Sequence, residues 1–264
     1  MIRSQEIKEK ARNYGVPIST IERDYVQNWL LKYIKNQDII LKGGTGIKKV
    51  YFENYRFSDD LDFSLAHSMN DKNIFMCLSN AVDIARNEVG IRFKENIKFS
   101  KTETGFRGVV YFNIIQNVSG TPLSIKVDIT DYDNEIILLP TEKKKIFHSY
   151  SDRLNAEIEV YSLEEIFTEK LRALIQRTRA RDLYDIGMLY EFIKKDKMLQ
   201  ILDDKFNFKG VFLDIPNFIN RREDFSNAWE RSLKHQIKEL VNFEIFFDKA
   251  VKILKNIQNL KLIK

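Results

Sequence analysis

The sequence contains few of the residues that cross-link, kink or loosen a chain. Its 264 residues include one cysteine, four prolines and ten glycines. Cys77 alone cannot form an internal disulfide, which excludes a disulfide-stapled secreted scaffold. The low glycine and proline content excludes collagen-like and linker-like chains. No purely apolar run is longer than a few residues, which excludes a membrane-spanning segment.

The composition is that of a chain with a large core. Hydrophobic residues make up 44% and charged residues 31%, unlike a disordered chain. The length suits one large domain or two smaller ones. The formal net charge of +5 is a mild basic excess, which permits a nucleotide or nucleic-acid partner without requiring one. The first 15 residues are charged and lack the apolar core of a signal peptide, so we expect a cytoplasmic protein.

The hydrophobic pattern changes along the chain. Up to about residue 158 it alternates between helical and strand-like periods, and beyond that it is helical throughout. Predicted helices span 20–35 (with Thr20 as N-cap), 45–52 and 71–88, and predicted strands span 38–42, 61–65, 107–115, 124–129 and 136–139, with a turn at 119–122. Further helices are predicted at 162–181, 182–203, 222–239 and 241–258, the first begun by a capping box of Ser162 and Glu165.

This pattern predicts an α+β chain, with an α/β domain over 1–158 and a helical domain over 159–264.

The first candidate site is the turn after the strand at 38–42. Gly43 and Gly44 let the backbone approach a ligand closely, and the N–H groups at the start of the next helix can bind phosphate. Thr45 adds a hydroxyl. Such a turn is more often structural than functional, and neither a Walker A loop nor a dinucleotide fingerprint is present. The turn therefore needs support from elsewhere in the chain.

An acidic pair follows at the start of the strand at 61–65. Asp60 and Asp62 are two residues apart, so on a strand their carboxylates point to the same face, whereas Asp59 points to the other. Two close carboxylates repel one another unless a cation lies between them, and hard divalent ions such as Mg²⁺ prefer such ligands. For the pair alone, an exposed acidic turn after Phe57 and Ser58 is equally compatible with the sequence.

A third carboxylate is expected if two metal ions are bound. Asp128 is the best candidate, because Ile125 and Val127 define the core face of its strand and leave Asp128 on the other face. Asp131 and Asp133 are alternatives. A plain solvent-facing residue is an equally good interpretation of any one of them.

The histidines and the cysteine offer no competing site. His67, His148 and His235 lack metal-binding spacing, which argues against a zinc hydrolase. Cys77 lies in a predicted apolar helix and is interpreted as a core residue.

The order GGT followed by RFSDDLDF resembles the nucleotidyltransferase signature of the DNA polymerase β-like superfamily. Within it, the chain is most similar to the AbiEii/AbiGii toxin family of bacterial abortive-infection and toxin–antitoxin systems. Segments 21–26, 169–174 with Arg177, and 181–186 fit that family as well, so the resemblance covers about residues 20–190. The 14 residues between Thr45 and Asp60 make the spacing long for the family, which leaves Asp59 as an alternative first acid.

The resemblance implies a polymerase β-like nucleotidyltransferase domain with a mixed sheet, followed by an α-helical bundle. It also implies one or two Mg²⁺ ions, or Mn²⁺, and an NTP substrate. The residues implied are Asp60, Asp62 and Asp128 as metal ligands, Gly43, Gly44, Thr45, Ser58, Lys170 and Arg177 for the nucleotide, and Lys170 and Asp185 as further catalytic residues.

The helical motif has its own physical interpretation. On a helix over 162–181, Lys170, Arg177 and Arg181 share one face and Lys170 emerges beside apolar residues. A buried ammonium needs an anion or a water-filled cleft, whereas the alternative is a lysine that snorkels over the core. The resemblance assigns Lys170 to the triphosphate, and Arg177, Arg179 and Arg181 bind phosphate or form a solvated basic face.

Two acids follow this helix. The resemblance places Asp185 or Asp182 at the active site. A helix N-cap is an equally supported role for Asp182.

The implied activity is transfer of a nucleoside monophosphate from an NTP to RNA, in particular tRNA, or to a protein. The protein would act as the toxin of a type IV toxin–antitoxin or abortive-infection system, with a separately encoded winged-helix antitoxin and no membrane partner. The alternatives are a non-catalytic nucleotide- or RNA-binding module on the same fold, and a small-molecule nucleotidyltransferase of the antibiotic-modifying kind.

Overall fold

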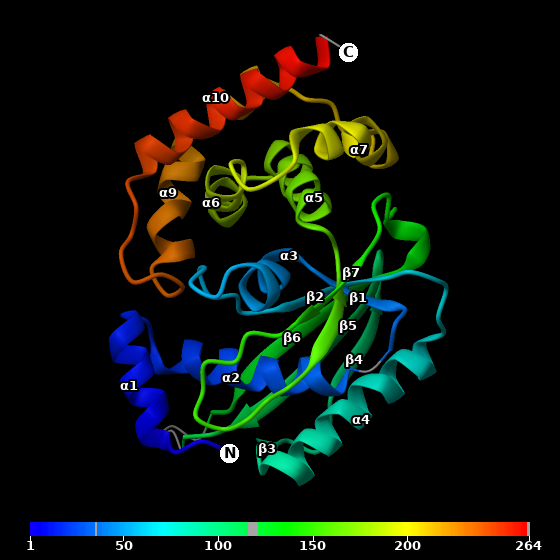
Figure 1. Ribbon diagram of the computed structural model, residues 1–264, viewed down its shortest axis with the longest axis vertical. Helices are drawn as coiled ribbons and strands as arrows, with labels where there is room; N and C mark the ends of the chain where they lie inside the picture. Colours follow the sequence, from blue (N-terminus) through cyan, green and yellow to red (C-terminus); the bar gives the residue numbers. More distant parts are fainter. Residues whose placement is uncertain (35, 116–120, 263–264) are drawn as a thin grey trace. The chain divides into compact units, whose positions relative to one another are not determined.

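The computed structural model describes residues 1–34, 36–115 and 121–262. The chain divides into two compact units (Figure 1). The first unit comprises Met1–Glu135 and Thr141–Tyr161, and the second comprises Ile136–Pro140 and Ser162–Lys264. The chain therefore passes into the second unit twice, first as a five-residue excursion.

The first unit is built on a mixed β-sheet. Among the described residues its strands follow the order β3-β5-β6-β2-β1-β8-β7, with β4 also paired to β5. The pairs β2–β6 and β1–β8 are parallel and the others are antiparallel. The strands are β1 (Ile39–Lys42), β2 (Leu61–Leu65), β3 (Arg92–Phe93), β4 (Lys98–Thr102), β5 (Gly105–Asn113), β6 (Leu123–Thr130), β7 (Glu142–Lys145) and β8 (Glu157–Val160).

Helices cover one face of this sheet. α2 and α4 pack against each other, α2 on β6 and α4 on β5 (Figure 1). The alternation of β6 follows from this, because Ile125, Val127 and Ile129 are buried while Lys126 and Asp128 on the opposite face are not. The helical segments of the unit are α1 (Ser4–Tyr14), α2 (Ile18–Tyr33), α3 (Gly43–Gly46), the π-helix η1 (Ile47–Tyr51), α4 (Asp71–Val89) and the 3-10 turn η2 (Tyr132–Asn134).

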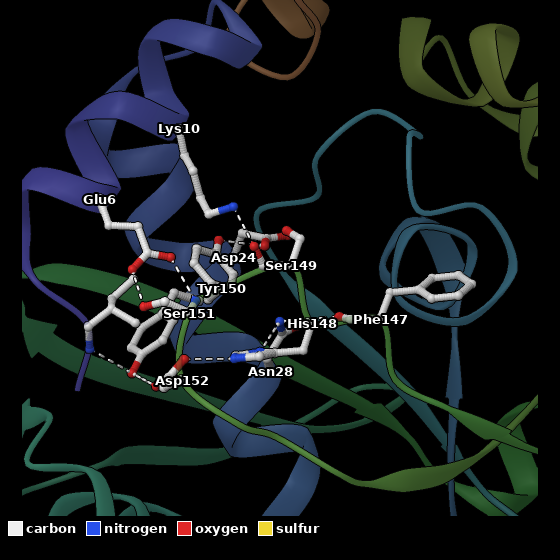
Figure 2. A network of polar contacts seen from close by, with 12 residues as sticks. Glu6, Lys10, Asp24, Asn28, Phe147, His148, Ser149, Tyr150, Ser151 and Asp152 are labelled. Atoms are coloured by element: carbon white, nitrogen blue, oxygen red, sulfur yellow. Dashed lines mark hydrogen bonds and ion pairs between the residues drawn. The ribbon is translucent and has the colours of Figure 1, made fainter.

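A polar network fastens the segment 147–152 to α1 and α2 (Figure 2). At its centre the buried Asp24 carboxylate accepts hydrogen bonds from Lys49 Nζ at 2.6 Å and from the Tyr150 hydroxyl at 2.8 Å. His148 Nε2 lies 2.8 Å from an oxygen of Asp152. The network fixes the middle of α2 against the loop before β8, and both lie in the first unit.

The second unit is helical apart from its excursion. The Glu165 carboxylate accepts hydrogen bonds from the backbone N–H groups of Leu138 and Leu139 at 3.1 and 2.8 Å. Lys205, fully buried, lies 2.7 Å from Glu165 and donates to the carbonyl of Ile136. The helices are α5 (Leu163–Gln176), α6 (Ala180–Leu189), α7 (Lys195–Phe208), α8 (Ile215–Asn220), α9 (Arg222–Leu233) and α10 (Phe243–Leu262).

The element predictions are confirmed best in the sheet. The strand at 61–65 matches β2, and the helix at 71–88 matches α4 to within one residue. The predicted turn at 119–122 lies partly outside the described residues. Of the capping box, the Ser162 hydroxyl accepts from the Glu165 backbone N–H at 3.2 Å, as predicted.

Several element predictions are wrong. The helix predicted over 182–203 is divided into α6, which ends at Leu189, and α7, which begins at Lys195. Residues 136–139 form no strand, because the Glu165 carboxylate binds their N–H groups in place of a neighbouring strand. α2 begins after Pro17, so Thr20 lies inside the helix rather than at its N-cap. The helix predicted over 162–181 ends at Gln176, and Arg177 is its extended C-cap.

No helix in the described part of the chain is long and apolar enough to cross a lipid bilayer.

Candidate functional site

The β-ladders of the first unit bring two predicted acids together. β2 pairs in parallel with β6, and Asp62 lies opposite Asp128. Directly paired residues on neighbouring strands share a face of the sheet. Both carboxylates therefore lie side by side on the face that α2 and α4 leave open, and both side chains are half-buried. On the other side of β2, Lys42 lies opposite Asp62.

The glycine turn after β1 packs directly against Asp62. Gly43 has the left-handed φ of 69°, and a Cβ atom there would lie 2.7 Å from Asp62 Oδ2. A Cβ atom on Gly44 would lie 2.8 Å from Arg56 Nη2 and 3.2 Å from the Ser58 hydroxyl. A side chain at either position would force Asp62 or Arg56 to shift, and at Gly43 the left-handed backbone angle also favours glycine. The turn and the acid form one site.

Thr45 and Ser58 hold this turn in place. The buried Thr45 hydroxyl donates to the backbone carbonyl of Asp60. The carbonyl of Ser58 accepts a hydrogen bond from Gln27 Nε2 of α2 at 2.9 Å. The segment before β2 is therefore tied both to the glycine turn and to α2. This placement gives Thr45 a positioning role that the sequence does not reveal.

Two arginines belong to the site and were missed from the sequence. Arg56 is buried beside Gly44, and its Nη1 donates to the Phe57 carbonyl at 3.2 Å. Arg107 of β5 lies opposite Asp128, with Nε 2.6 Å from its carboxylate. The pKa of Arg107 is raised, first by the hydrogen bond and charge of Asp128, and also by the charge of Asp60. Arg56 is the first residue of the RFSDDLDF segment, and this position is the sequence signal from which its place in the site could have been inferred.

The other acids near the site have different surroundings. Asp59 reaches Arg23 Nη1 at 3.9 Å. Asp131 is the N-cap of η2, where its carboxylate accepts from the Tyr132 N–H at 2.8 Å, and Asp133 is exposed. Asp128 is therefore the one of the three third-acid candidates that the ladder sets beside Asp62.

The donor set of the acid pair suits Mg²⁺. Across the described residues, no group of three or more His, Cys, Asp or Glu side chains is gathered closely enough to hold a metal ion. Mg²⁺ is commonly bound by one or two carboxylates together with substrate phosphates, and does not need an all-protein cage. The half-buried pair of Asp62 and Asp128 beside a glycine turn fits that manner of binding.

The second unit contains a buried ionic cluster. Lys170 Nζ of α5 lies 2.8 Å from Asp182 and 3.0 Å from Asp185, both carboxylates of α6 that are almost fully buried. Arg177 Nε binds the second oxygen of Asp182 at 3.1 Å, while 46% of its side chain remains exposed. Burial raises the pKa of Asp182, but the charges and hydrogen bonds of Lys170 and Arg177 outweigh it and hold that pKa far below the usual range.

This cluster answers the questions left open for the helical motif. The anion that Lys170 requires is supplied by Asp182 and Asp185, so Lys170 is not a snorkelling lysine. The N-cap of α6 is Arg179, without a side-chain cap bond, so the prediction that Asp182 caps the helix is wrong. The prediction that Lys170, Arg177 and Arg181 share one helix face is also wrong, because α5 ends at Gln176.

Comparison with known proteins identifies the family. Residues 26–252 match the family model of the nucleotidyl transferase AbiEii toxin of type IV toxin–antitoxin systems. The chain belongs to this family. A comparison with curated proteins finds no match.

Solved structures share the fold of this AbiEii family member. The structure is similar to MenT4, a nucleotidyltransferase toxin from Mycobacterium tuberculosis, with a TM-score of 0.63 and 18% identity over 96% of this chain and 89% of that one. It is also similar to JHP933 from Helicobacter pylori, with a TM-score of 0.59 and 18% identity over 93% and 96% of the two chains. The predicted family, its nucleotidyltransferase activity and the mixed α/β fold are confirmed.

Proposed function

We propose that this toxin transfers a nucleoside monophosphate from an NTP to the end of an RNA, with tRNA as the preferred acceptor. The observation that carries the proposal is the packing of Gly43 against Asp62, with Asp128 in register beside it. A phosphate-binding turn next to two metal-binding carboxylates is what the transfer requires, because positioning and charge neutralisation dominate phosphoryl-type chemistry.

We assign a role to each site residue of the first unit. Asp60, Asp62 and Asp128 would hold Mg²⁺, which when bound would neutralise negative charge on the phosphates. The Gly43–Gly44 backbone accommodates the triphosphate at close range. Arg107 balances the charge of Asp128 until the metal and nucleotide arrive.

In the second unit we propose different tasks for the two cations. Lys170 neutralises Asp182 and Asp185, and through Asp182 it positions Arg177. Arg177, with its half-exposed guanidinium, binds a phosphate of the substrate. Asp185 then supports the cluster rather than the reacting atoms. The helical unit thus acts as a domain in its own right, with its own phosphate-binding group.

The biological setting follows from the family. A type IV toxin has an antitoxin, and we propose that it is a separately encoded protein with a winged-helix part. We further propose that the toxin works in the cytoplasm, where it halts growth or phage propagation.

The test of this function is incorporation of labelled nucleotide. The protein is incubated with each of the four labelled NTPs, Mg²⁺ and total cellular RNA, and the RNA is resolved on a gel. We expect label in the tRNA size range with one or a few of the NTPs, and none in the presence of excess EDTA. Label found only in protein, or only in a small hydroxyl or amine compound, would contradict the RNA acceptor.

A further inference from the structure

The open face of the sheet continues from the acid pair across β6, β5 and β4. In the ladders, Asp128 lies opposite Arg107, and Lys126 lies opposite Val109, which in turn lies opposite Lys98 of β4. Directly paired residues share a face, so these cations line the same surface as Asp128. We name this surface the basic face. Its cations are Arg92, Lys94, Lys98, Arg107 and Lys126.

The basic face has a one-sided charge. Among the described residues within β3 to β6 that share this face, Asp128 is the single acid, and Glu95 adds a second acid in the cavity lined by Lys94 and Lys98. All five cations are exposed. Only Arg107 has an ion pair among the described residues, and its partner is Asp128. An array of five exposed cations that outnumbers its two acids attracts a polyanion, and here the array leads to the proposed metal ligands.

The outer end of the basic face holds an aromatic cavity. The hollow has a volume of about 680 Å³, and its lining includes Lys94, Lys98, Tyr111, Pro122 and Glu95. The ammonium groups of Lys94 and Lys98 lie 5.8 and 5.3 Å from the centre of the Tyr111 ring. Tyr111 is half-buried, with the backbone of Lys94 hydrogen-bonded to its carbonyl. An aromatic ring with two cations beside it offers a stacking platform for a base whose phosphates the cations bind.

We propose that the basic face binds a single strand of the acceptor RNA. One base stacks on Tyr111, its neighbouring phosphates bind Lys94 and Lys98, and the strand crosses Lys126 toward Asp128. This inference rests on the proposed RNA acceptor and adds the place where that acceptor is held. A nucleic-acid strand is favoured over an acidic protein segment because the ring supplies a surface for bases, which carboxylate side chains do not use.

The binding test uses RNA alone, so that it does not depend on catalysis. A fluorescein-labelled 12-nucleotide oligo(U) RNA is titrated by anisotropy without NTP or divalent metal. We expect the double variant Lys94→Glu/Lys98→Glu to weaken binding on the order of a hundredfold, and Tyr111→Leu about tenfold. In the milder variant Lys94→Ala/Lys98→Ala, the slope of log affinity against log salt falls in magnitude by roughly 1.4, about 0.7 for each lost phosphate contact.

Two variants serve as matched controls. Lys101→Glu reverses an exposed charge on the same strand, but Lys101 lies opposite Phe106, on the other face of the sheet. Tyr111→Phe keeps the stacking ring. Both are expected to bind the RNA within about twofold of the wild type, since neither removes a phosphate contact or the platform. Thermal unfolding of every variant checks that the fold is retained.

The outcomes separate this inference from the proposed function. The proposal that the basic face binds RNA is overturned if the wild type and the Lys94→Glu/Lys98→Glu variant bind RNA equally well. It is also overturned if the wild type does not bind RNA. Stronger displacement by polyglutamate or by free NTP than by unlabelled oligo(U) also overturns it, in favour of an acidic protein or a nucleotide. If the double variant labels RNA with an unchanged KM for RNA, the basic face fails while the proposed function stands. If the wild type labels no RNA, the proposed RNA acceptor is contradicted. The binding assay then tests separately whether the basic face binds RNA.

Discussion

The two charged clusters of this toxin handle their aspartates in opposite ways. In the first unit, Asp62 and Asp128 are half-buried on the open face of a sheet, and Arg107 forms an ion pair with Asp128. In the second unit, Asp182 and Asp185 are almost fully buried and bonded to Lys170. A half-buried carboxylate remains accessible to a ligand, whereas a buried carboxylate bonded to a cation is shielded from one. From this difference we infer a catalytic role for the first cluster, and for the buried Lys170, Asp182 and Asp185 of the second cluster a structural one.

The largest expected effect is on transfer in the first cluster. Asp62→Asn keeps the size of the side chain but removes the charge that the metal needs, so we expect nucleotide transfer to fall on the order of a thousandfold. The melting temperature should stay within a few degrees of the wild type, because asparagine keeps the size of the side chain and the site is only half-buried.

The matched control for Asp62→Asn is Asp133→Asn, which alters an exposed acid of η2 outside the ladder. It should leave transfer unchanged. Equal loss of transfer in both variants would contradict the assignment of Asp62.

The next effect is on stability in the second cluster. Lys170→Met leaves two buried carboxylates without their ammonium, so we expect a loss of about 3–5 kcal/mol in the free energy of unfolding. Urea denaturation measures this loss. Asp62→Asn and Lys170→Met together test the difference between the two clusters most sharply. Asp62→Asn should lose activity, whereas Lys170→Met should lose stability.

Arg177→Gln tests the division of labour within the second cluster. Arg177 is half-exposed, so the variant should cost far less stability than Lys170→Met and should weaken NTP binding. If Arg177→Gln binds NTP as tightly as the wild type and a folded Lys170 variant binds it more weakly, the phosphate-binding role belongs to Lys170 instead.

A smaller effect is expected at the glycine turn. Gly43→Ala and Gly90→Ala place alanine at similar left-handed angles, φ 69° and 77°, and each should cost about 1–2 kcal/mol of stability. Only at Gly43 does the new Cβ meet Asp62, whereas at Gly90 nothing lies within 4 Å. We expect Gly43→Ala alone to lower transfer, by about tenfold to a hundredfold, because it displaces Asp62, a proposed metal ligand. Equal activity of the two variants would show that the contact with Asp62 is irrelevant.

The smallest effect is a pH dependence in the polar network. Burial lowers the pKa of Lys49 to about 8, although the charge of Asp24 opposes it. Between that value and its usual 10.5, the folded state binds fewer protons at Lys49 than the unfolded state, so this residue's contribution to stability rises with pH.

Lys49→Met removes that contribution. The difference in unfolding free energy between wild type and Lys49→Met should therefore shift in favour of the wild type from pH 8 to pH 9.5, by at most about 1.4 kcal/mol per pH unit. Urea denaturation at these two pH values measures it. A difference that does not vary with pH would contradict the lowered pKa.

The sequence predicted the parts of the molecule that depend on local pattern. β2 follows from strict alternation around Phe63, and the glycine turn follows from its position at the end of a buried strand. Asp128 could also be predicted from the sequence as the third acid, because the alternation of side chains in β6 assigned it to the open face. These predictions needed only the side-chain period of a strand.

The missed features depend on contacts between distant residues. Arg107 joins the site because β5 pairs with β6 in one register, and no local pattern fixes that register. The partners of Lys170 depend on the break after Gln176, which turns α6 back so that Asp182 and Asp185 meet it. The capture of Leu138 by Glu165 likewise replaced a predicted strand by a side-chain contact.

The most direct test of the central claim is a crystal structure of the protein with Mg²⁺ and a non-hydrolysable NTP. We predict a metal ion at about 2.0–2.1 Å from carboxylate oxygens of both Asp62 and Asp128, with the triphosphate against the backbone of Gly43 and Gly44. A nucleotide bound elsewhere, or a metal ion held without Asp62, would contradict the account.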